Sequence, residues 1–353
     1  MSAIPKNQNT IMSLKADGIH EKSESLFRSS MRRLLRNRLA VVGIVIIVLF
    51  ILVAIFADSV APKSFRQQTL VDNNSAPRWI IDLFPTMTPR LDDVPVGEPN
   101  GYVRVNDDYF LGADSLGRDL FSRIIYGARV SLLVAFIGPI VSMIVGVALG
   151  LIAGYFGGRI DNLIMRFTDI MYAFPTLLLI ILLIAFFRPT TGQLDPGSLT
   201  YRMNQLDAST GGMLFIFVGI GLTSWMQMAR ITRGQVLSVR ENEYVLAAES
   251  IGTPTFSIMS RHVLPNILGP IIVAETLTIP RYISYEAFLS FIGLGVNPPT
   301  PSWGAMIADG SSVIRDYPNQ ALFPALALFL IMFAFNFLGD GLRDALDPRM
   351  RGA

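Results

Sequence analysis

Two carboxylates in the first third of the sequence stand at a spacing that could serve acid–base chemistry. Asp114 and Asp119 lie in the stretch LGADSLGRD, shortly before a long apolar run. A carboxylate pair can divide the roles of general acid and general base, but no nucleophile, base or metal-ligand cluster accompanies these two. We therefore expect a structural role, in which Asp114 and Ser115 form an N-cap or Asx-turn at the start of a helix whose first turn holds Asp119.

The rest of the chain offers little further catalytic chemistry. It contains no Cys, and its two His residues, His20 and His262, are too few for a histidine metal cluster. The nucleotide-binding, zinc-protease and serine-hydrolase motifs G-x-x-x-x-G-K-[ST], H-E-x-x-H and G-x-S-x-G do not occur in the sequence. We predict a protein that has no catalytic residues and no metal site and that binds no cofactor directly.

Four ionisable residues fall within apolar runs or at their edges: Asp169, Glu275, Arg281 and Glu286. A charge at the centre of a membrane helix costs about 2.5–3.5 kcal/mol on insertion scales, so such groups face protein or a water-filled cavity. We expect the deepest, Glu275, to face a cavity, and Arg281 and Glu286 to be hydrated near the outer end. Asp169 precedes Pro175, whose kink is typical of a path-lining helix, although packing explains it equally well. The three carboxylates are candidates for a translocation path.

The composition places these residues in a membrane protein. Hydrophobic residues make up 51% of the 353 residues, charged residues make up 16%, and the mean hydropathy is +0.47, values that are typical of a polytopic membrane protein. We expect an all-α integral membrane protein with six transmembrane helices. The six predicted spans are 40–57, 130–153, 169–187, 211–229, 266–289 and 322–338. The net charge of +2 is small and the basic residues sit at span edges, so no nucleic-acid partner is implied.

Charge asymmetry sets the orientation. Without the long segment 58–128, the four segments predicted to be cytosolic hold fifteen Lys and Arg residues, and the two short external loops hold three. Both termini are therefore expected in the cytosol. A secretory signal peptide is the competing interpretation of the first apolar run, but the polar stretch before it is too long. Residues 1–24 lack apolar periodicity and are expected to be a disordered tail.

One amphipathic stretch, Glu243 to Asn266, lies between two spans on the cytosolic side. Its sequence EYVLAAESIGTPTFSIMSRHVLPN predicts a helix, a turn at Gly252, a second helix and a stop at Leu264-Pro265. The small side chains of Ala247 and Ala248 let another protein approach closely, and Gly252 permits a positive φ. We interpret this stretch as a docking loop.

These motifs resemble those of a known family. The docking loop is similar to the EAA loop of ABC-importer permeases, with Leu246 where Glu is usual and His262 where Ile is common. The segment from Leu111 to Leu132, LGADSLGRDLFSRIIYGARVSL, resembles the segment before the second span of peptide and nickel permeases, and EAFLSFIGLG, PSWG and GDGLRDALDP also match. The stretch TLTIP is closer to the oligopeptide branch, so the chain resembles a C-type subunit of the oligopeptide/dipeptide/nickel importers.

The resemblance implies a type I ABC-importer permease fold, function and partners. Its ATPase-docking residues would be Tyr244, Ala247, Ala248, Gly252, Leu264 and Pro265, and its extracytoplasmic motif Asp114, Gly117, Arg118 and Asp119. The chain would pair with a second homologous permease subunit, two ATP-binding subunits that hold ATP and Mg, and an extracytoplasmic peptide-binding protein, within membrane lipid. It would import oligopeptides by alternating access across the bacterial inner (plasma) membrane. A permease for a nickel chelate or another small solute is the alternative.

Two other classes of protein remain open at the level of sequence. An ion-coupled secondary transporter would show paired repeats and intramembrane carboxylates, of which only the carboxylates Asp169 and Glu275 are present. A membrane-embedded hydrolase would need a nucleophile and a base at one depth, and His262 falls in the cytosolic loop. Either would work alone, whereas a permease subunit would be inert without its partners.

Several local features complete the expected layout. Relative to the family, residues 64–107 resemble an insertion, expected to pack over the outer mouth and to tolerate deletion of 75–100. We expect a short strand at Tyr102–Val105, a short helix at Trp303–Ala308 with Trp303 as an interfacial anchor, and close helix packing at the small residues of GVALG.

The expected divisions are a cytosolic polar and basic tail 1–39, a first span 40–57, an extracytoplasmic segment 58–126, a transmembrane core 127–344 with docking loop 240–265, and a cytosolic tail 345–353.

The absence of native Cys allows a direct test of the topology. Single Cys probes at Asn100, Gln205 and Asn319 are expected to react with an impermeant thiol reagent added outside sealed cells, and probes at Thr10 and Ser257 are not. Each probe is labelled again after the membrane is opened, which controls for buried sites. External labelling of Ser257→Cys would contradict the predicted orientation.

Overall fold

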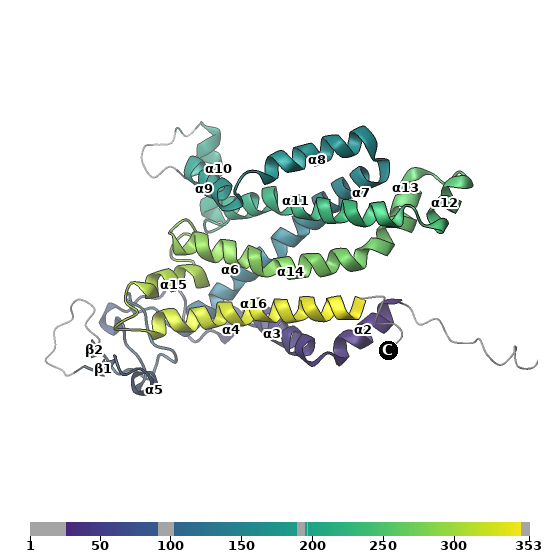
Figure 1. Cartoon of the computed structure of the whole chain (residues 1–353). Coiled ribbons are helices and arrows are strands. Elements are labelled where there is room, and N and C mark those ends of the chain that lie inside the picture. Colours follow the sequence, from purple (N-terminus) through teal and green to yellow (C-terminus); the bar gives the residue numbers. More distant parts are fainter. Residues whose placement is uncertain (1–25, 91–101, 189–194, 196, 347–353) are drawn as a thin grey trace, which may run out of the picture.

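The computed structural model describes residues 26–90, 102–188, 195 and 197–346. Within these ranges the chain is mainly helical, and the long helices run side by side (Figure 1). The helices have the following bounds: α2 Leu26–Arg36, α3 Arg38–Ile55, α4 Ala57–Val60, η1 Leu70–Asp72, α5 Arg78–Leu83, α6 Leu120–Val141, η2 Ser142–Gly146, α7 Val147–Phe156, α8 Gly158–Tyr172, α9 Thr176–Phe187, α10 Leu199–Ser209, α11 Leu214–Val239, α12 Glu243–Ser250, α13 Thr255–Ile258, η3 Met259–Val263, α14 Leu264–Phe291, α15 Trp303–Ser311 and α16 Asn319–Leu346. The strands are β1 Thr88–Pro89 and β2 Tyr102–Val103.

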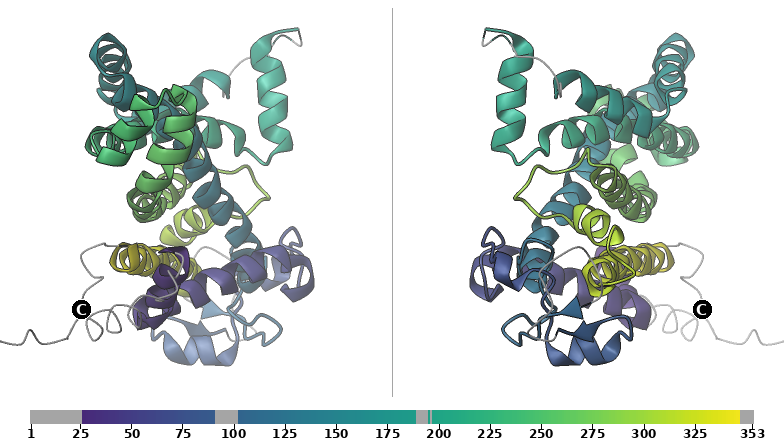
Figure 2. Two further views of the ribbon diagram at one scale, coloured as in Figure 1. Left: turned by 90° about the vertical axis from the view of Figure 1, so that its right-hand side faces the viewer. Right: turned by 90° about the vertical axis from the view of Figure 1, so that its left-hand side faces the viewer.

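Five helical segments among the described residues are long and apolar enough to cross a membrane, and a sixth is obtained if the bent pair α8 and α9 counts as one span. Helix α3 packs on α16, α16 on α14, α14 on α11, and α11 on α7, while α6 contacts α3, α11 and α14. The end-on views show this row of helices, with α16 beside α3 on one side (Figure 2). Helices α2, α12 and α13 lie at one end of the bundle, and α5, β1, β2 and α15 lie at the other (Figure 1).

The second span begins ten residues earlier than Val130, at Leu120. Asp119 is its N-cap, because its carboxylate accepts a hydrogen bond from the backbone N–H of Ser122 at 2.7 Å. Asp114 instead forms an Asx-turn, with Oδ1 accepting from the backbone N–H groups of Leu116 and Arg118 at 2.9 and 3.0 Å. The expected turn at Asp114 is confirmed, but the expectation that it starts the helix is wrong. Gly117, at φ +70°, separates the turn from the helix.

Small residues bring the second and fourth spans into close contact, as GVALG predicts. A Cβ built on Gly146 would lie 2.7 Å from Met228, and one on Gly150 would lie 2.5 Å from the Cβ of Thr232. These distances are below normal van der Waals contact, so only Gly fits at these positions on the face of η2 and α7 that packs on α11. The predicted close packing is confirmed.

The third span is broken at the predicted position, and by more than a kink. Helices α8 and α9 are bent by 72° at Pro175. The short connection expected between the second and third spans, including Arg159 and Arg166, is largely the helix α8. Its polar face is held to α11 by Arg233, which donates to both carboxylate oxygens of Asp161 at 2.5 and 2.6 Å. This ion pair explains why a charged segment forms an ordered helix here.

The segment between α4 and α6 has its own small core and is more than a covering loop. Ala76, Ile80, Ile81, Met87 and Val103 are buried together with Tyr317 from the turn before α16. The strand expected at Tyr102–Val105 is shorter, β2, and it pairs in parallel with β1. The described part lies at the α15 end of the bundle (Figure 1). Because deleting 75–100 would remove buried side chains, we no longer expect that deletion to leave the fold intact.

Both ends of the described chain contribute to packing. Residues 26–36, expected to belong to a polar tail, form α2, whose Leu34 is buried against Ala345 at the end of α16. Asn319, expected to be an accessible outer position, is 1% exposed, and its amide donates to the carbonyl of Leu111 at 3.0 Å. Gln205, which is exposed, is thus the better outer labelling site. The expected disordered tail 1–24 and the probe sites Thr10 and Asn100 lie outside the described residues.

The helix expected at Trp303–Ala308 is confirmed as α15, but Trp303 is not an interfacial anchor. Its side chain is fully buried, its ring contacts Phe50 edge to face with centroids 5.3 Å apart, and its Nε1–H donates to the carbonyl of Ile124 at 3.0 Å. A Cβ on Gly127 would lie 3.1 Å from the indole ring. Trp303 therefore joins α3, α6 and α15 at the end of the bundle where α15 lies.

Removing this indole should destabilise the protein. We expect Trp303→Ala to cost about 3–5 kcal/mol in the free energy of unfolding, and Trp303→Phe to cost less because most of the ring is kept. The thermal midpoint of the purified protein in detergent measures the effect. Trp79→Ala is the control, since Trp79 is 43% exposed; an equal loss in Trp79→Ala and Trp303→Ala would contradict the assignment.

Candidate functional site

The docking loop is a compact helical hairpin. Helix α12 ends at Ser250, the chain turns at Gly252, and α13 begins at Thr255. Gly252 has φ +79°, as the sequence predicts, and a Cβ there would meet nothing within 4 Å. The backbone angle, rather than crowding, therefore requires Gly at this turn.

The expected stop at Leu264-Pro265 is wrong. The π-helical turn η3 joins α13 to α14, so the helix continues through Pro265 into the fifth span. Pro265 is tolerated because it directly follows the π-helical turn η3, which takes up the change in register where Pro lacks an N–H. Leu264 is half-buried and Pro265 exposed. The docking loop is thus directly continuous with a transmembrane helix.

The two alanines of the docking loop have different environments. Ala247 is exposed, whereas Ala248 is 6% exposed and packs in a core cluster with Val245, Ile258 and Val263. Within this chain, Ala248 therefore faces the other helices of the loop and is not available to a partner. The prediction that both alanines form a docking surface needs this correction.

Large apolar side chains are exposed on the loop, and two of them, Ile251 and Phe256, were not among the predicted docking residues. Ile251 is 83% exposed, Phe256 is 77% exposed, and Leu246 and Tyr244 are also exposed. They surround the Gly252 turn, and we call Leu246, Ile251 and Phe256 the apolar tip. In the sequence, the feature that indicates this cluster is a Gly in a loop between two spans with apolar residues on both sides of it. Such a cluster is typical of a protein-contact surface.

Polar contacts fix the loop to the spans. The hydroxyl of Tyr155, at the end of α7, donates to Glu249 at 2.7 Å. Arg240 donates to the carbonyls of Gly154 and Tyr155 at 3.1 and 3.2 Å, which caps the carboxyl end of α7. Force applied to the apolar tip would therefore reach α7, α11 and α14.

Two carboxylates lie inside the helix bundle. Glu275 is 5% exposed and accepts hydrogen bonds from Ser142 at 2.8 Å and Tyr282 at 3.2 Å. It faces protein rather than the cavity described below. Glu286 is fully buried and accepts from Ser131 and Ser290, so the expectation that it is hydrated near the outer end is wrong. Ser131 lies on α6, and Ser290 lies on α14, the helix that carries Glu286 itself, so this carboxylate links the two helices.

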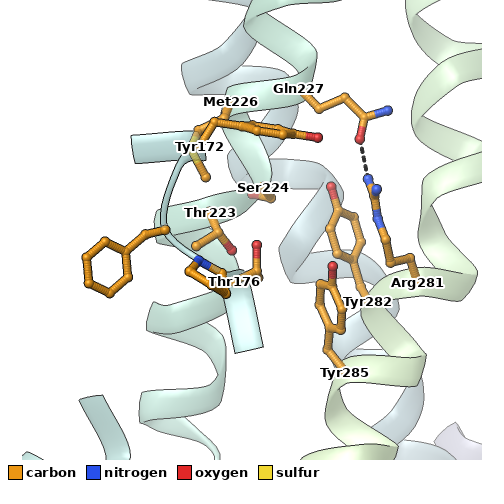
Figure 3. A pocket seen from close by; sticks show the side chains of 11 residues that line it. Tyr172, Thr176, Thr223, Ser224, Met226, Gln227, Arg281, Tyr282 and Tyr285 are labelled. Atoms are coloured by element: carbon orange, nitrogen blue, oxygen red, sulfur yellow. Dashed lines mark hydrogen bonds between the residues drawn. The ribbon is translucent and has the colours of Figure 1, made fainter. Parts of the chain in front are cut away.

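A cavity of about 240 Å³ lies at the break between α8 and α9, bordered by α11 and α14. Thr176 and Thr223 lie on one side of it and Tyr282 and Tyr285 on the other (Figure 3). It is lined by Tyr172, Phe174, Pro175, Thr176, Thr223, Ser224, Met226, Gln227, Arg281, Tyr282 and Tyr285. None of the three predicted path carboxylates is in this lining; Arg281 is. We call this space the break cavity.

Asp169 lies on α8 near the break cavity but is bound to another residue. Its carboxylate accepts from Arg230 at 2.6 Å, and the Arg230 guanidinium lies 4.5 Å from the ring centroid of Tyr172. Asp169 and Arg230 are both largely exposed. This ion pair links the end of α8 to α11, and Asp169 is not part of the cavity lining.

The outer motif forms a buried charge cluster. Arg118 pairs with Asp114 at 2.6 Å, Arg123 lies 3.6 Å from Asp114, and Arg118 reaches Asp309 of α15 at 3.8 Å. Burial raises the pKa of the Asp119 carboxyl, and the hydrogen bonds from Ser122 oppose that rise. Asp114 is occupied by arginine and Asp119 by a helix cap, which agrees with the structural rather than the catalytic interpretation of this pair.

The unequal burial of the two alanines can be tested by stability. Ala248→Leu should overpack the core of the docking loop and cost about 1–3 kcal/mol, whereas Ala247→Leu adds its side chain to an exposed position. The thermal midpoint of the purified subunit is expected to fall only for Ala248→Leu. Equal midpoints for the two variants would show that Ala248 is not packed as described.

Comparisons with known proteins agree on one family. The family model for the binding-protein-dependent transport system inner membrane component matches residues 146–352, and the model for the N-terminal TM domain of oligopeptide transport permease C matches residues 25–77. The oligopeptide transport system permease protein OppC of Bacillus subtilis is 37% identical over 99% of this chain and 100% of that protein. The dipeptide transport system permease protein DppC of the same species is 37% identical over 96% and 90%.

Among solved structures, an inward-facing conformation of the MetNI methionine ABC transporter aligns with a TM-score of 0.46 and 15% identity, covering 62% of this chain and 96% of that chain. The sequence matches extend over nearly the whole chain and include both the first span and the transmembrane core. The chain therefore belongs to the family of inner-membrane components of binding-protein-dependent transport systems, the ABC-importer permeases.

Proposed function

We propose that this chain is a translocation subunit of an ABC importer for peptides. The observation that carries the proposal is the docking loop, whose apolar tip is exposed while its base is continuous with a transmembrane helix. An exposed Ile and Phe beside a rigid Gly turn are suited to a groove on another protein. The ATPase activity, with ATP and Mg, would reside in that partner.

The complete importer would contain four kinds of subunit. This chain would adopt a type I permease fold with six spans and both termini in the cytosol, and it would pair with a second homologous permease. Two ATP-binding subunits would dock on the cytosolic loops, and an extracytoplasmic peptide-binding protein would deliver substrate at the α15 end. The clustering of α2, α12 and α13 at one end of the bundle supports this orientation (Figure 1).

Peptide is the substrate class that the relatives favour. The two relatives named above are permeases of oligopeptide and dipeptide transport systems. The break cavity adds polar side chains and tyrosine rings, which suit the amide groups and side chains of a peptide. A nickel chelate or another small solute remains the alternative cargo.

The connection between the docking loop and α14 supplies a route for coupling. Closure of the ATP-binding subunits would move α12 and α13, and the continuous helix through η3 would carry this movement to α14, which holds Arg281 and Tyr285. Tyr155 and Arg240 would pass it to α7 as well. The break cavity would then change its access from one side of the membrane to the other.

A charge placed on the apolar tip tests the proposed docking. Ile251→Asp and Phe256→Asp each put a carboxylate into the proposed contact, and loss of a contact hot spot typically costs about 2 kcal/mol or more, or roughly thirtyfold in affinity. We expect both variants to co-purify with less ATP-binding subunit and to lose stimulation of ATP hydrolysis by loaded binding protein.

Leu70→Asp is the matched control, because Leu70 is 65% exposed but lies in the outer segment. It should keep normal ATPase association. Full association and stimulation in both tip variants would contradict the docking assignment, and a loss in Leu70→Asp of equal size would show that the effect is not specific to the tip.

A further inference from the structure

The break cavity is lined by one charged side chain, Arg281, which is exposed within this chain. Arg281 lies ten residues before the end of α14 at Phe291, which is about 15 Å along the helix axis and about half of a hydrocarbon layer roughly 30 Å thick. Its side chain is exposed, as expected of a hydrated group. A guanidinium at this depth cannot face lipid without a large cost, so it must face a polar space or a partner.

The immediate contacts of Arg281 leave most of its hydrogen-bonding capacity unused. Its Nη2 donates to the side-chain oxygen of Gln227 on α11 (Figure 3), and a guanidinium has five N–H donors. The ion pairs found among the described residues do not include Arg281. Gln227 is neutral, so it orients the guanidinium without cancelling its charge.

The rest of the cavity is suited to an anion. Its lining contains one cationic side chain, Arg281, and no carboxylate. Of the predicted path carboxylates, Asp169 is paired with Arg230. Glu275, which interacts electrostatically with Arg281, lies outside the lining and is enclosed by Ser142 and Tyr282. Thr176, the first residue of α9, also lines the cavity, and the amino end of a broken membrane helix carries positive partial charge that favours anionic groups.

We infer that Arg281 binds the terminal carboxylate of the transported peptide while the peptide crosses the break cavity. This inference rests on the proposed peptide import and names the group of the substrate that the cavity recognises. A guanidinium can hold a carboxylate with two parallel hydrogen bonds. The hydroxyls of Thr176, Thr223 and Tyr285 and the ring of Tyr172 line the space beside it, where they suit the adjoining peptide bond and side chain.

The inference predicts discrimination by charge at the end of the peptide. The complete importer is reconstituted in proteoliposomes, with ATP on the docking-loop side and saturating binding protein opposite, and transport of tetra-alanine is compared with transport of tetra-alanine amide. Because the binding protein is saturating, a difference in its affinity for the two peptides does not affect the comparison. The unmodified importer should move the free acid faster than the amide.

Three variants isolate the role of the charge. Arg281→Gln should lower transport of the free acid roughly tenfold and leave transport of the amide nearly unchanged, so that the ratio falls towards one. Arg281→Lys, which keeps the charge but not the planar fork, should recover part of the ratio. Arg202→Gln is the control, because Arg202 is exposed on α10 and outside the cavity lining, and it should leave the ratio as in the unmodified importer.

The outcomes separate this inference from the proposed function. Transport of neither peptide by the unmodified importer, with ATP hydrolysis intact, would refute peptide import itself. Transport of both peptides with a ratio that Arg281→Gln does not change would refute the role of Arg281 alone. Binding-protein-stimulated ATP hydrolysis is measured in every variant. If Arg281→Gln lowers transport of the acid and of the amide equally and also loses this stimulation, Arg281 serves the structure of the subunit and the inference is overturned.

Discussion

This structure depends on one constraint: the charged groups that helices carry into an apolar layer must be paired. Helix α8 remains beside α11 because Asp161 and Asp169 are met by Arg233 and Arg230. Inside the bundle, Glu275 and Glu286 are held by hydroxyl groups. An unpaired charge would cost several kcal/mol at these depths, so each partner limits how the neighbouring helices can lie.

Arg281 differs from these paired or enclosed charges. Its described partner is a neutral amide, and it faces a cavity formed where the third span is broken. The break frees the amino end of α9, and the continuous helix from the docking loop to α14 places Arg281 on the element that a cytosolic partner would move. The same helix thus joins the proposed energy input to the proposed substrate contact.

Much of this arrangement could be predicted from the sequence, because the signals were local. Apolar run length predicted where the spans lie, Pro175 predicted the break, GVALG predicted close packing, and Gly252 predicted a left-handed turn. The errors came from long-range contacts. Burial of Ala248, Glu286 and Trp303 depends on which helices meet them, and a single sequence does not contain that information.

Helix ends were predicted less well for a related reason. Apolar character ends where the lipid does, but α6 and α11 continue beyond it because caps and partners such as Asp119 and Arg240 stabilise the extra turns. Pro265 was interpreted as a stop because Pro usually breaks a helix, yet directly after the π-helical turn η3 it is compatible with one.

The central claim is that this chain moves peptide only with energy supplied by docked partners. The most direct measurement is accumulation of labelled tetra-alanine by proteoliposomes that contain either this chain alone or the complete set of subunits, under ATP or under an imposed ion gradient. The account predicts accumulation only with the complete set, binding protein and ATP. Gradient-driven accumulation by this chain alone would contradict it and would indicate an ion-coupled secondary transporter.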